Sequence, residues 1–373
     1  MTWAGGMLRL LRYVGPADIA RDARGAPRGL AVRSGGELRS ALAGIGGRTQ
    51  RELWLTYVVD AEGVLRVADR GSEHVACAGG GPVIAAGELV IEGERVVRAS
   101  NLSTGYCPEP GDCARALVSR LKSAGIGAPE TFDRFELRLC RSCGAREVIK
   151  DSHFECSTCG APLPERWNFE RAAHLRGWIE GPRRWTVDVI VEPGSRDQDR
   201  AVARLSAHES FLALADGAGG GAHGARAAEA VVEHTARADS MSAILELDRR
   251  LELIGGQSTA ILARLAIGET LRVEGASVGD SQAWARVGDT WVELTERQRR
   301  KPLLGSGRAE PIAFAREGVD ALVMHSDGLR HITIERMAAL VASDAEHAGW
   351  AIVDAARTAK GALDDDVALV IVR

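Results

Sequence analysis

FLALADGAGGGAHG, residues 211–224, joins a short apolar run to a carboxylate, a run of glycines and the start of a helical stretch. The apolar run predicts a buried strand, and Asp216 stands where that strand ends. A glycine-rich loop that opens a helix can bind phosphate through its backbone N–H groups. The carboxylate of Asp216 would repel a phosphate there unless a cation lies between them. The stretch therefore predicts a metal site with room for an anionic substrate.

Other carboxylates in the second half of the chain occupy similar positions. Each stands at one end of an apolar run: Asp199, Asp280 in Gly-Asp-Ser, Asp327 in Ser-Asp-Gly, and Asp365 in Asp-Asp-Asp before VALVIV. Carboxylates that converge on one point repel each other unless a cation separates them. Hard cations such as Mg²⁺ take oxygen ligands and keep several waters. The pattern predicts a metal-dependent hydrolytic centre that acts on phosphate.

The order of elements after Trp185 predicts the fold class of this half. Short apolar runs typical of strands are interrupted by one pair of helical stretches and followed by a second pair, and VALVIV closes the chain as a strand. The helical stretches are residues 223–237, 240–254, 333–343 and 346–359. We expect two sheets packed face to face with helices outside.

Residues 185–373 resemble the metal-dependent protein serine/threonine phosphatases of the PPM family. The matching motifs occur in the family's order: RDQD (196–199), FLALADGAGG (211–220), GGQSTAI (255–261), VGDSQAW (278–284), ELT (293–295), LLGSG (303–307), VMHSDGL (323–329) and DDDVALVIV (364–372). The resemblance implies an α+β fold, an αββα sandwich of two antiparallel sheets flanked by helices. It also implies that a water activated by Mn²⁺ or Mg²⁺ hydrolyses phosphoserine and phosphothreonine in proteins.

The resemblance further implies a role for each carboxylate. Asp216, Asp327 and Asp365 would hold a first Mn²⁺ or Mg²⁺ ion and so act as catalytic residues. Asp216 and the carbonyl of Gly217 would hold a second ion, with Asp199 near its waters. The substrates would be phosphoproteins, the targets of a bacterial serine/threonine kinase.

A third, looser ion would be held by Asp280 with Asp327. At three other positions this chain departs from the family's usual sequence. The family usually has an arginine at the position of Gly194, so the nearby Arg196 is the candidate for contacting phosphate. Gln198 stands where many relatives carry glutamate, and Ala218 replaces the histidine that some members use as general acid. These departures leave open a catalytically impaired phosphatase fold that only binds phosphoproteins.

Four of the seven cysteines form a zinc-ribbon pattern. Cys140 and Cys143 make one C-x-x-C pair, and Cys156 and Cys159 make a second pair twelve residues later. Such turns present four thiolates to one tetrahedral Zn²⁺, and a site with all four positions filled by cysteine is structural. Redox-active C-x-x-C pairs and a nucleic-acid-binding ribbon are the alternatives. We expect a structural zinc ribbon over residues 135–168.

Residues 1–134 predict a small α+β domain of unknown ligand, with an irregular first 50 residues. Residues 87–101 are typical of a hairpin around Glu92-Gly93-Glu94, and residues 112–124 of a helix that begins at Asp112 as N-cap. Residues 72–110 faintly resemble a module of bacterial effector-like proteins and plant calmodulin-binding proteins. The domain could regulate or target the phosphatase, or be an effector-type enzyme that the rest of the chain regulates.

The composition of the chain limits which kinds of partner and which location we expect. The chain has 373 residues, of which 45% are hydrophobic and 26% charged, as in ordinary globular proteins. A net charge of −4 makes nucleic acid an unlikely partner. No apolar run approaches the roughly 20 residues that span a bilayer, so we expect no membrane contact. Together with the reduced cysteine pattern, this predicts a cytoplasmic location.

Overall fold

The computed structural model of the protein describes residues 7–24, 26–45, 52–140, 142–169, 173–194, 196–219, 222–234, 240–343, 348–358 and 362–373. The chain divides into two compact units. The first is Arg9–Ala173, and the second is His174–Arg373 together with Met7 and Leu8. Within the described residues, no helix has the length and apolar character needed to cross a membrane.

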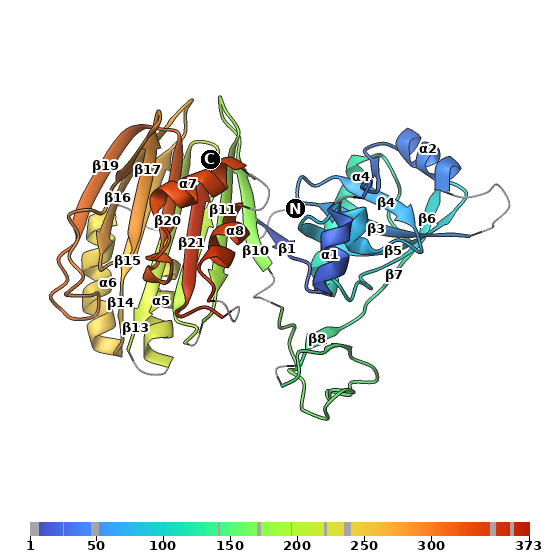
Figure 1. The fold of residues 1–373 in the computed structure, drawn as a ribbon. Helices are drawn as coiled ribbons and strands as arrows, with labels where there is room; N and C mark the ends of the chain where they lie inside the picture. Colours follow the sequence, from blue (N-terminus) through green and yellow to red (C-terminus); the bar gives the residue numbers. More distant parts are fainter. Residues whose placement is uncertain are drawn as a thin grey trace. The chain divides into compact units, whose positions relative to one another are not determined.

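One sheet of the second unit contains the last strand of the chain (Figure 1). The strand order is β18-β17-β20-β21-β11-β10, and all neighbours are antiparallel. The strands are β10 (Ala173–Ile179), β11 (Trp185–Glu192), β17 (Gln282–Val287), β18 (Thr290–Glu293), β20 (Ala321–His325) and β21 (Val367–Val372). The apolar runs of the sequence therefore form strands here, as predicted.

The other sheet of the second unit has the order β12-β13-β15-β16-β19, with the short β14 beside the end of β13. These strands are also antiparallel. They are β12 (Asp199–Arg204), β13 (Glu209–Ala218), β14 (Gln257–Ser258), β15 (Ala260–Ala266), β16 (Leu271–Val278) and β19 (Ile312–Val319).

Both faces of the central strands are buried. In β13, Leu212 and Leu214 belong to a hydrophobic cluster that joins the two sheets, whereas Ala213 and Ala215 pack against helices. Side chains of a strand alternate between its faces, so a strand buried on both faces becomes a continuous apolar run. The small alanines let the helices approach the sheet closely.

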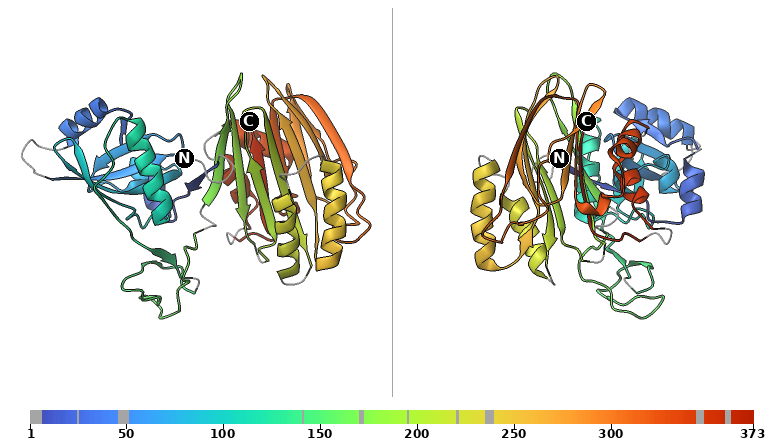
Figure 2. Two further views of the ribbon diagram at one scale, coloured as in Figure 1. Left: turned by 180° about the vertical axis from the view of Figure 1, so that it is seen from behind. Right: turned by 60° about the vertical axis from the view of Figure 1, so that its left-hand side comes forward.

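Each sheet carries one helix pair on the face away from that shared cluster (Figure 2). Helices α5 (Ala222–His234) and α6 (Ser240–Ile254) pack on β12, β13, β15 and β16. Helices α7 (Ile334–Ser343) and α8 (Ala348–Ala355) share a cluster with β11, β20 and β21. Where described, all four helices lie within a few residues of the helical stretches predicted from the sequence.

The first unit is built on the order β5-β3-β4-β2, with β6 beside β5 and β7 beside β6. Its strands are β2 (Leu30–Val32), β3 (Leu53–Asp60), β4 (Leu65–Asp69), β5 (Val83–Glu92), β6 (Arg95–Ser100), β7 (Thr131–Asp133) and, from Arg9 onward, β1 (Met7–Leu11). Its helices are α1 (Ala17–Ala23), α2 (Gly35–Ile45), α3 (His74–Cys77) and α4 (Pro110–Ser123). The turn between β5 and β6 is the predicted hairpin around Gly93.

Two expectations for this unit differ from the structure. The start of the chain is not irregular where it is described, because β1, α1, β2 and α2 occupy most of residues 7–45. Their apolar residues show only weak periodicity in the sequence, but Leu38 and Ala41 lie on one face of α2 and are buried. The N-cap of α4 is Glu109 rather than Asp112, since the Glu109 carboxylate accepts a hydrogen bond from the Asp112 N–H at 2.7 Å. Pro110 supplies the first helical position.

Candidate metal centre

Four of the predicted carboxylates line one cavity of about 700 Å³ at an end of the second unit's sheets. They come from distant segments: Asp216 from β13, Asp280 from the turn between β16 and β17, Asp327 from the end of β20, and Asp365 from the approach to β21. Gly217 and Arg196 line the same cavity. The structure thus brings together all of the acidic residues predicted for the centre except Asp199.

Asp199 lies at the base of this group rather than in its wall. It opens β12 and stands directly opposite Asp216 in the β12–β13 ladder. The side chain is only 3% exposed, and its Oδ2 atom has no hydrogen-bond partner among the described residues. Burial, and after it the charge of Asp216, raises the pKa of Asp199 well above its usual value. Two like charges held this close need a proton or a cation between them.

The other carboxylates feel the same repulsion. Burial, followed by the charges of Asp327 and Asp365, raises the pKa of Asp216 to about 7. Burial, followed by the charges of Asp280 and Asp365, raises the pKa of Asp327. Each carboxylate is therefore costly to ionise while the others are charged, and a divalent cation would remove that cost.

Backbone contacts fix Asp216 in place. Its N–H donates to the Thr259 hydroxyl at 3.0 Å, and its carbonyl accepts from the Thr259 N–H at 2.8 Å. Beside it, Gly217 touches the start of α5 so closely that an added Cβ would lie 2.3 Å from the carbonyl oxygen of Gly224. The glycine-rich sequence is needed for this contact, which brings the loop against the helix.

Asp366 organises the loop that carries Arg196, a role the sequence analysis missed. Its buried carboxylate accepts hydrogen bonds from the N–H groups of Gly194 at 2.6 Å, Arg196 at 3.3 Å and Gln198 at 2.6 Å. The Asp-Asp-Asp run was the available signal, but only Asp365 of that run was assigned a role. A carboxylate that accepts several backbone N–H groups is a positioning residue for the loop.

The same loop explains why this chain has no arginine at position 194. An added Cβ on Gly194 would lie 2.6 Å from the carbonyl carbon and oxygen of Asp365. No side chain fits there without moving the backbone that presents Asp365. Arg196, two residues later, does line the cavity.

Cationic side chains surround the acidic floor of the cavity. Arg300, Lys301 and Arg330 line it together with Arg196, and His223 is the histidine among its described lining residues. Arg300 Nε lies 2.8 Å from Asp280 Oδ2, and Arg330 NH1 lies 3.4 Å from Asp327 Oδ2. These three cations lie outside the motifs that carry the family resemblance, so the sequence offered no signal for them.

The donor set fits hard divalent cations. Carboxylate and carbonyl oxygens are the ligands that Mg²⁺ and Mn²⁺ take, and the unpartnered oxygen of Asp199 adds a further acceptor. Among the described residues, only the cysteine group has three or more ligand atoms within 4.8 Å of one another. The described carboxylates line the cavity at a wider spacing than this.

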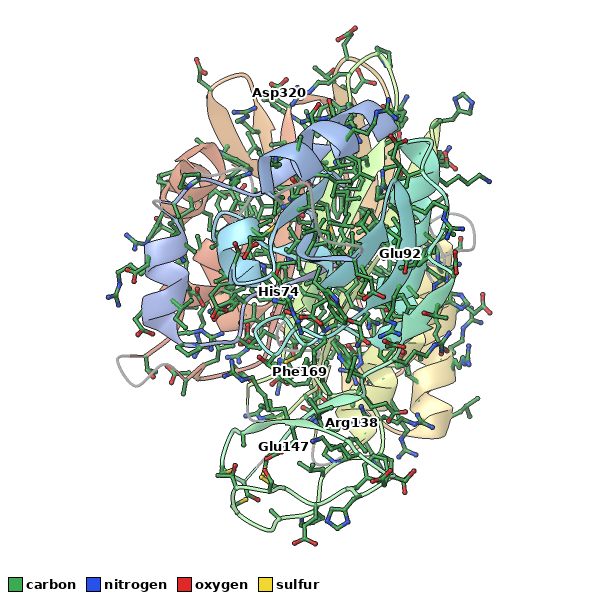
Figure 3. All side chains as sticks on the ribbon, turned by 90° about the vertical axis from the view of Figure 1, so that its right-hand side faces the viewer. His74, Glu92, Arg138, Glu147, Phe169 and Asp320 are labelled. Atoms are coloured by element: carbon green, nitrogen blue, oxygen red, sulfur yellow. The ribbon has the colours of Figure 1, made fainter. Side chains whose placement is uncertain are left out.

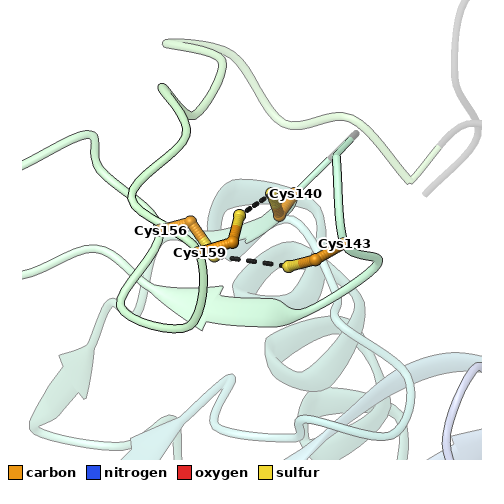
Figure 4. Close-up of side chains that lie close together, drawn as sticks. All are labelled: Cys140, Cys143, Cys156 and Cys159. Carbon is orange, nitrogen blue, oxygen red and sulfur yellow. Dashed lines mark hydrogen bonds between the residues drawn. The ribbon is translucent and has the colours of Figure 1, made fainter.

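The predicted cysteine ribbon has the geometry of a four-thiolate site (Figure 4). Cys140 Sγ lies 3.6 Å from Cys159 Sγ, and Cys143 Sγ lies 3.6 Å from Cys156 Sγ. Hydrogen bonding from the backbone N–H of Cys143 is the main cause that lowers the pKa of the Cys140 thiol, to about 6. This quartet could hold Zn²⁺, and all four ligand positions are protein thiols.

Short strands and one arginine support this ribbon. Strand β8 (Leu137–Leu139) precedes the first cysteine pair, and β9 (Arg146–Val148) lies between the two pairs. The two strands pair antiparallel. Arg138 donates to the carbonyls of Pro164 and Glu165, and Glu147 accepts from Cys156 Sγ at 3.3 Å. Both side chains are labelled in Figure 3. These contacts tie the hairpin to the segment that follows the second cysteine pair.

Comparisons with known proteins find similarity in structure only. A scan against protein families finds no match, and a search of curated proteins finds none either. The S. agalactiae serine/threonine phosphatase is 18% identical, with 50% of this chain and 98% of that chain covered and a TM-score of 0.43. Stp1 from Staphylococcus aureus is 17% identical, with 50% and 93% covered and a TM-score of 0.42. RsbX in complex with magnesium is 14% identical, with 53% and 98% covered and a TM-score of 0.44.

Proposed function

We propose that the second unit is a PPM-type phosphatase that hydrolyses phosphoserine and phosphothreonine in proteins with the help of Mn²⁺ or Mg²⁺. The observation that carries this proposal is the gathering of Asp216, Asp280, Asp327 and Asp365 around one cavity that Arg196 also lines. The order of helix pair, sheet, sheet and helix pair agrees with the αββα sandwich implied by the sequence resemblance. The proposed substrates are targets of a bacterial serine/threonine kinase in the cytoplasm.

The roles of the carboxylates follow their positions in the cavity. Asp216, Asp327 and Asp365 would hold one ion, and Asp216 with the Gly217 carbonyl would hold another. Asp199 is buried behind Asp216 and would hold a water or a proton of this group. Bound divalent ions would lower the pKa of a water and neutralise charge on the phosphoryl group.

The proposed nucleophile is a water activated by the bound ions. The cavity's described lining residues include no serine or cysteine, and the Thr259 hydroxyl among them accepts a hydrogen bond from the Asp216 N–H. Arg196 supplies a guanidinium that can bind two phosphoryl oxygens side by side. It would hold the phosphate over the acidic floor, and Asp366 holds the loop of Arg196 in place.

The proposal is tested by Mn²⁺-dependent hydrolysis of a chromogenic aryl phosphate and of phosphoserine and phosphothreonine peptides by the full chain. We expect turnover that Asp216→Ala and Asp327→Asn reduce by about 1000-fold, since each removes a ligand charge. Asp289→Asn, in the exposed turn between β17 and β18, is the matched control. Phosphopeptide binding without turnover would favour the catalytically impaired binding module instead.

A further inference from the structure

Two cavity cations pair with carboxylates of the predicted third metal site, Arg330 with Asp327 and Arg300 with Asp280, and the shorter contact is that of Arg300. Its Nε atom lies 2.8 Å from Asp280 Oδ2. Asp280 and Arg300 both line the cavity, and Arg300 reaches it from the segment that follows β18. The acid that would serve a loosely bound ion thus already has a positive charge beside it.

Asp280 is held rigidly at the end of β16. The preceding Gly279 has φ +94°, and an added Cβ there would lie 2.7 Å from the Thr259 side chain. The following Ser281 hydroxyl lies 2.8 Å from the Thr259 hydroxyl, and both side chains are buried. These contacts fix the backbone of the turn that presents Asp280 to the cavity.

The segment that carries Arg300 is anchored on both sides. Before it, the Thr295 hydroxyl accepts a hydrogen bond from the Ala283 N–H at 3.1 Å, and Thr295 is buried. After it, Leu304 exchanges two backbone hydrogen bonds with Ser258, at 3.0 and 3.2 Å. The cation is presented by a short loop fixed at both ends, and its charge also acts on Asp327.

We propose that the guanidinium of Arg300 takes the place of a third divalent ion, so that this centre works with two. This inference rests on the proposed function. Asp280 Oδ2 is engaged by Arg300, and a divalent cation bound there would stand within a few ångströms of a like charge. Arginine remains protonated at any pH at which the protein is folded, so the charge is permanent.

The test is the number of Mn²⁺ ions bound by the zinc-loaded full chain, measured by calorimetry and by the electron paramagnetic resonance signal of free Mn²⁺. We expect two ions for the wild type and two for Arg300→Lys, which keeps the charge. Arg300→Gln, which removes it, gains a third ion, and Arg300→Gln combined with Asp280→Asn returns to two. Arg316→Ala, an exposed arginine on β19 away from the cavity, serves as the control and binds two.

Three ions in the wild type, or two in Arg300→Gln, would overturn the role of Arg300 and leave the proposed phosphatase standing. A wild type that binds no Mn²⁺ while it retains its zinc would overturn the metal centre itself, and the role of Arg300 with it. The two failures are therefore distinguishable in one titration. Asp280→Asn alone is expected to leave the count unchanged at two, whereas a genuine third site at Asp280 would lower the count from three to two.

Discussion

Asp199 and Asp216 are paired directly opposite each other in the antiparallel β12–β13 ladder. Like charges in this position destabilise a sheet. We expect Asp199→Asn to stabilise the metal-free protein at pH 8 by about 1–2 kcal/mol, because it removes a buried carboxyl group that is costly to ionise beside Asp216. Urea denaturation in a chelator measures the effect. With saturating Mn²⁺ we expect Asp199→Asn to be less stable than the wild type instead. If the variant were less stable both in the chelator and with Mn²⁺, this account would be contradicted.

The raised pKa of Asp216, about 7, predicts proton release on metal binding. An unfolded aspartate has a pKa near 3.9. Between these two values the folded, metal-free state keeps a proton that the unfolded state has lost, so the Asp216 contribution to stability falls as pH rises from about 4 to 7. Mn²⁺ must displace that proton, and its affinity should rise about tenfold per pH unit below 7 and then level off. Calorimetry at pH 6 and 8 in buffers of different ionisation enthalpy measures the number of protons released on Mn²⁺ binding. If no proton were released at pH 6, the coupling between Mn²⁺ binding and Asp216 deprotonation would be refuted.

Asp366 should matter for stability as well as for turnover. Asp366→Asn leaves at least one of the three backbone N–H groups of residues 194–198 facing an NH₂ group instead of an acceptor. We expect a loss of about 3 kcal/mol in urea denaturation, because buried donors lose a charged acceptor. The exposed Asp364→Asn, two residues earlier in the same acidic run, is expected to change stability by less than about 0.5 kcal/mol. Equal effects of the two variants would remove the role assigned to Asp366.

Arg196 is predicted to bind substrate phosphate. Arg196→Ala should raise KM by about tenfold and weaken inhibition by inorganic phosphate to a similar degree, and Arg196→Lys should restore part of both, because lysine keeps the charge but not the paired donors. Gly194→Arg, which restores the family's residue, should destabilise the protein instead, since its Cβ overlaps the Asp365 carbonyl. Unchanged phosphate inhibition in Arg196→Ala would exclude this contact.

The cysteine ribbon is predicted to contain one zinc per chain. Cys143→Ser or Cys159→Ser should abolish zinc retention measured by mass spectrometry after dialysis, because a structural site needs its four thiolates. Cys77→Ser, which changes a buried thiol of the first unit outside the quartet, should retain it. Purified protein without zinc but with disulfides between these cysteines would favour the redox interpretation.

The fold of the second unit could be predicted from the sequence because local and long-range signals agree there. Leu212 and Leu214 alternate with Ala213 and Ala215, and both sets are buried. The start of the chain offered no such agreement. Helix α2 buries only Leu38 and Ala41 among its described side chains, so its short apolar face was lost among glycine and arginine residues.

The sequence predicted the aspartates that line the candidate site, but it did not predict the residues that pair with them or position the neighbouring loop. Asp216, Asp280 and Asp327 follow apolar runs and Asp365 precedes one, and all four line the same cavity. The partners of a loop are set by tertiary contacts that spacing does not reveal. Asp366 lies about 170 residues from the N–H groups that it binds, and Arg300 lies 20 residues from Asp280 with two strands between them.

The ion pair between Arg300 and Asp280 would affect how such an enzyme responds to a low concentration of free metal ions. A centre that carries one of its charges on its own chain must acquire fewer ions from its surroundings. At low free manganese, occupancy would fall with the square of the concentration rather than with its cube. Dephosphorylation would then persist through a shortage that silences an enzyme with three ions to collect.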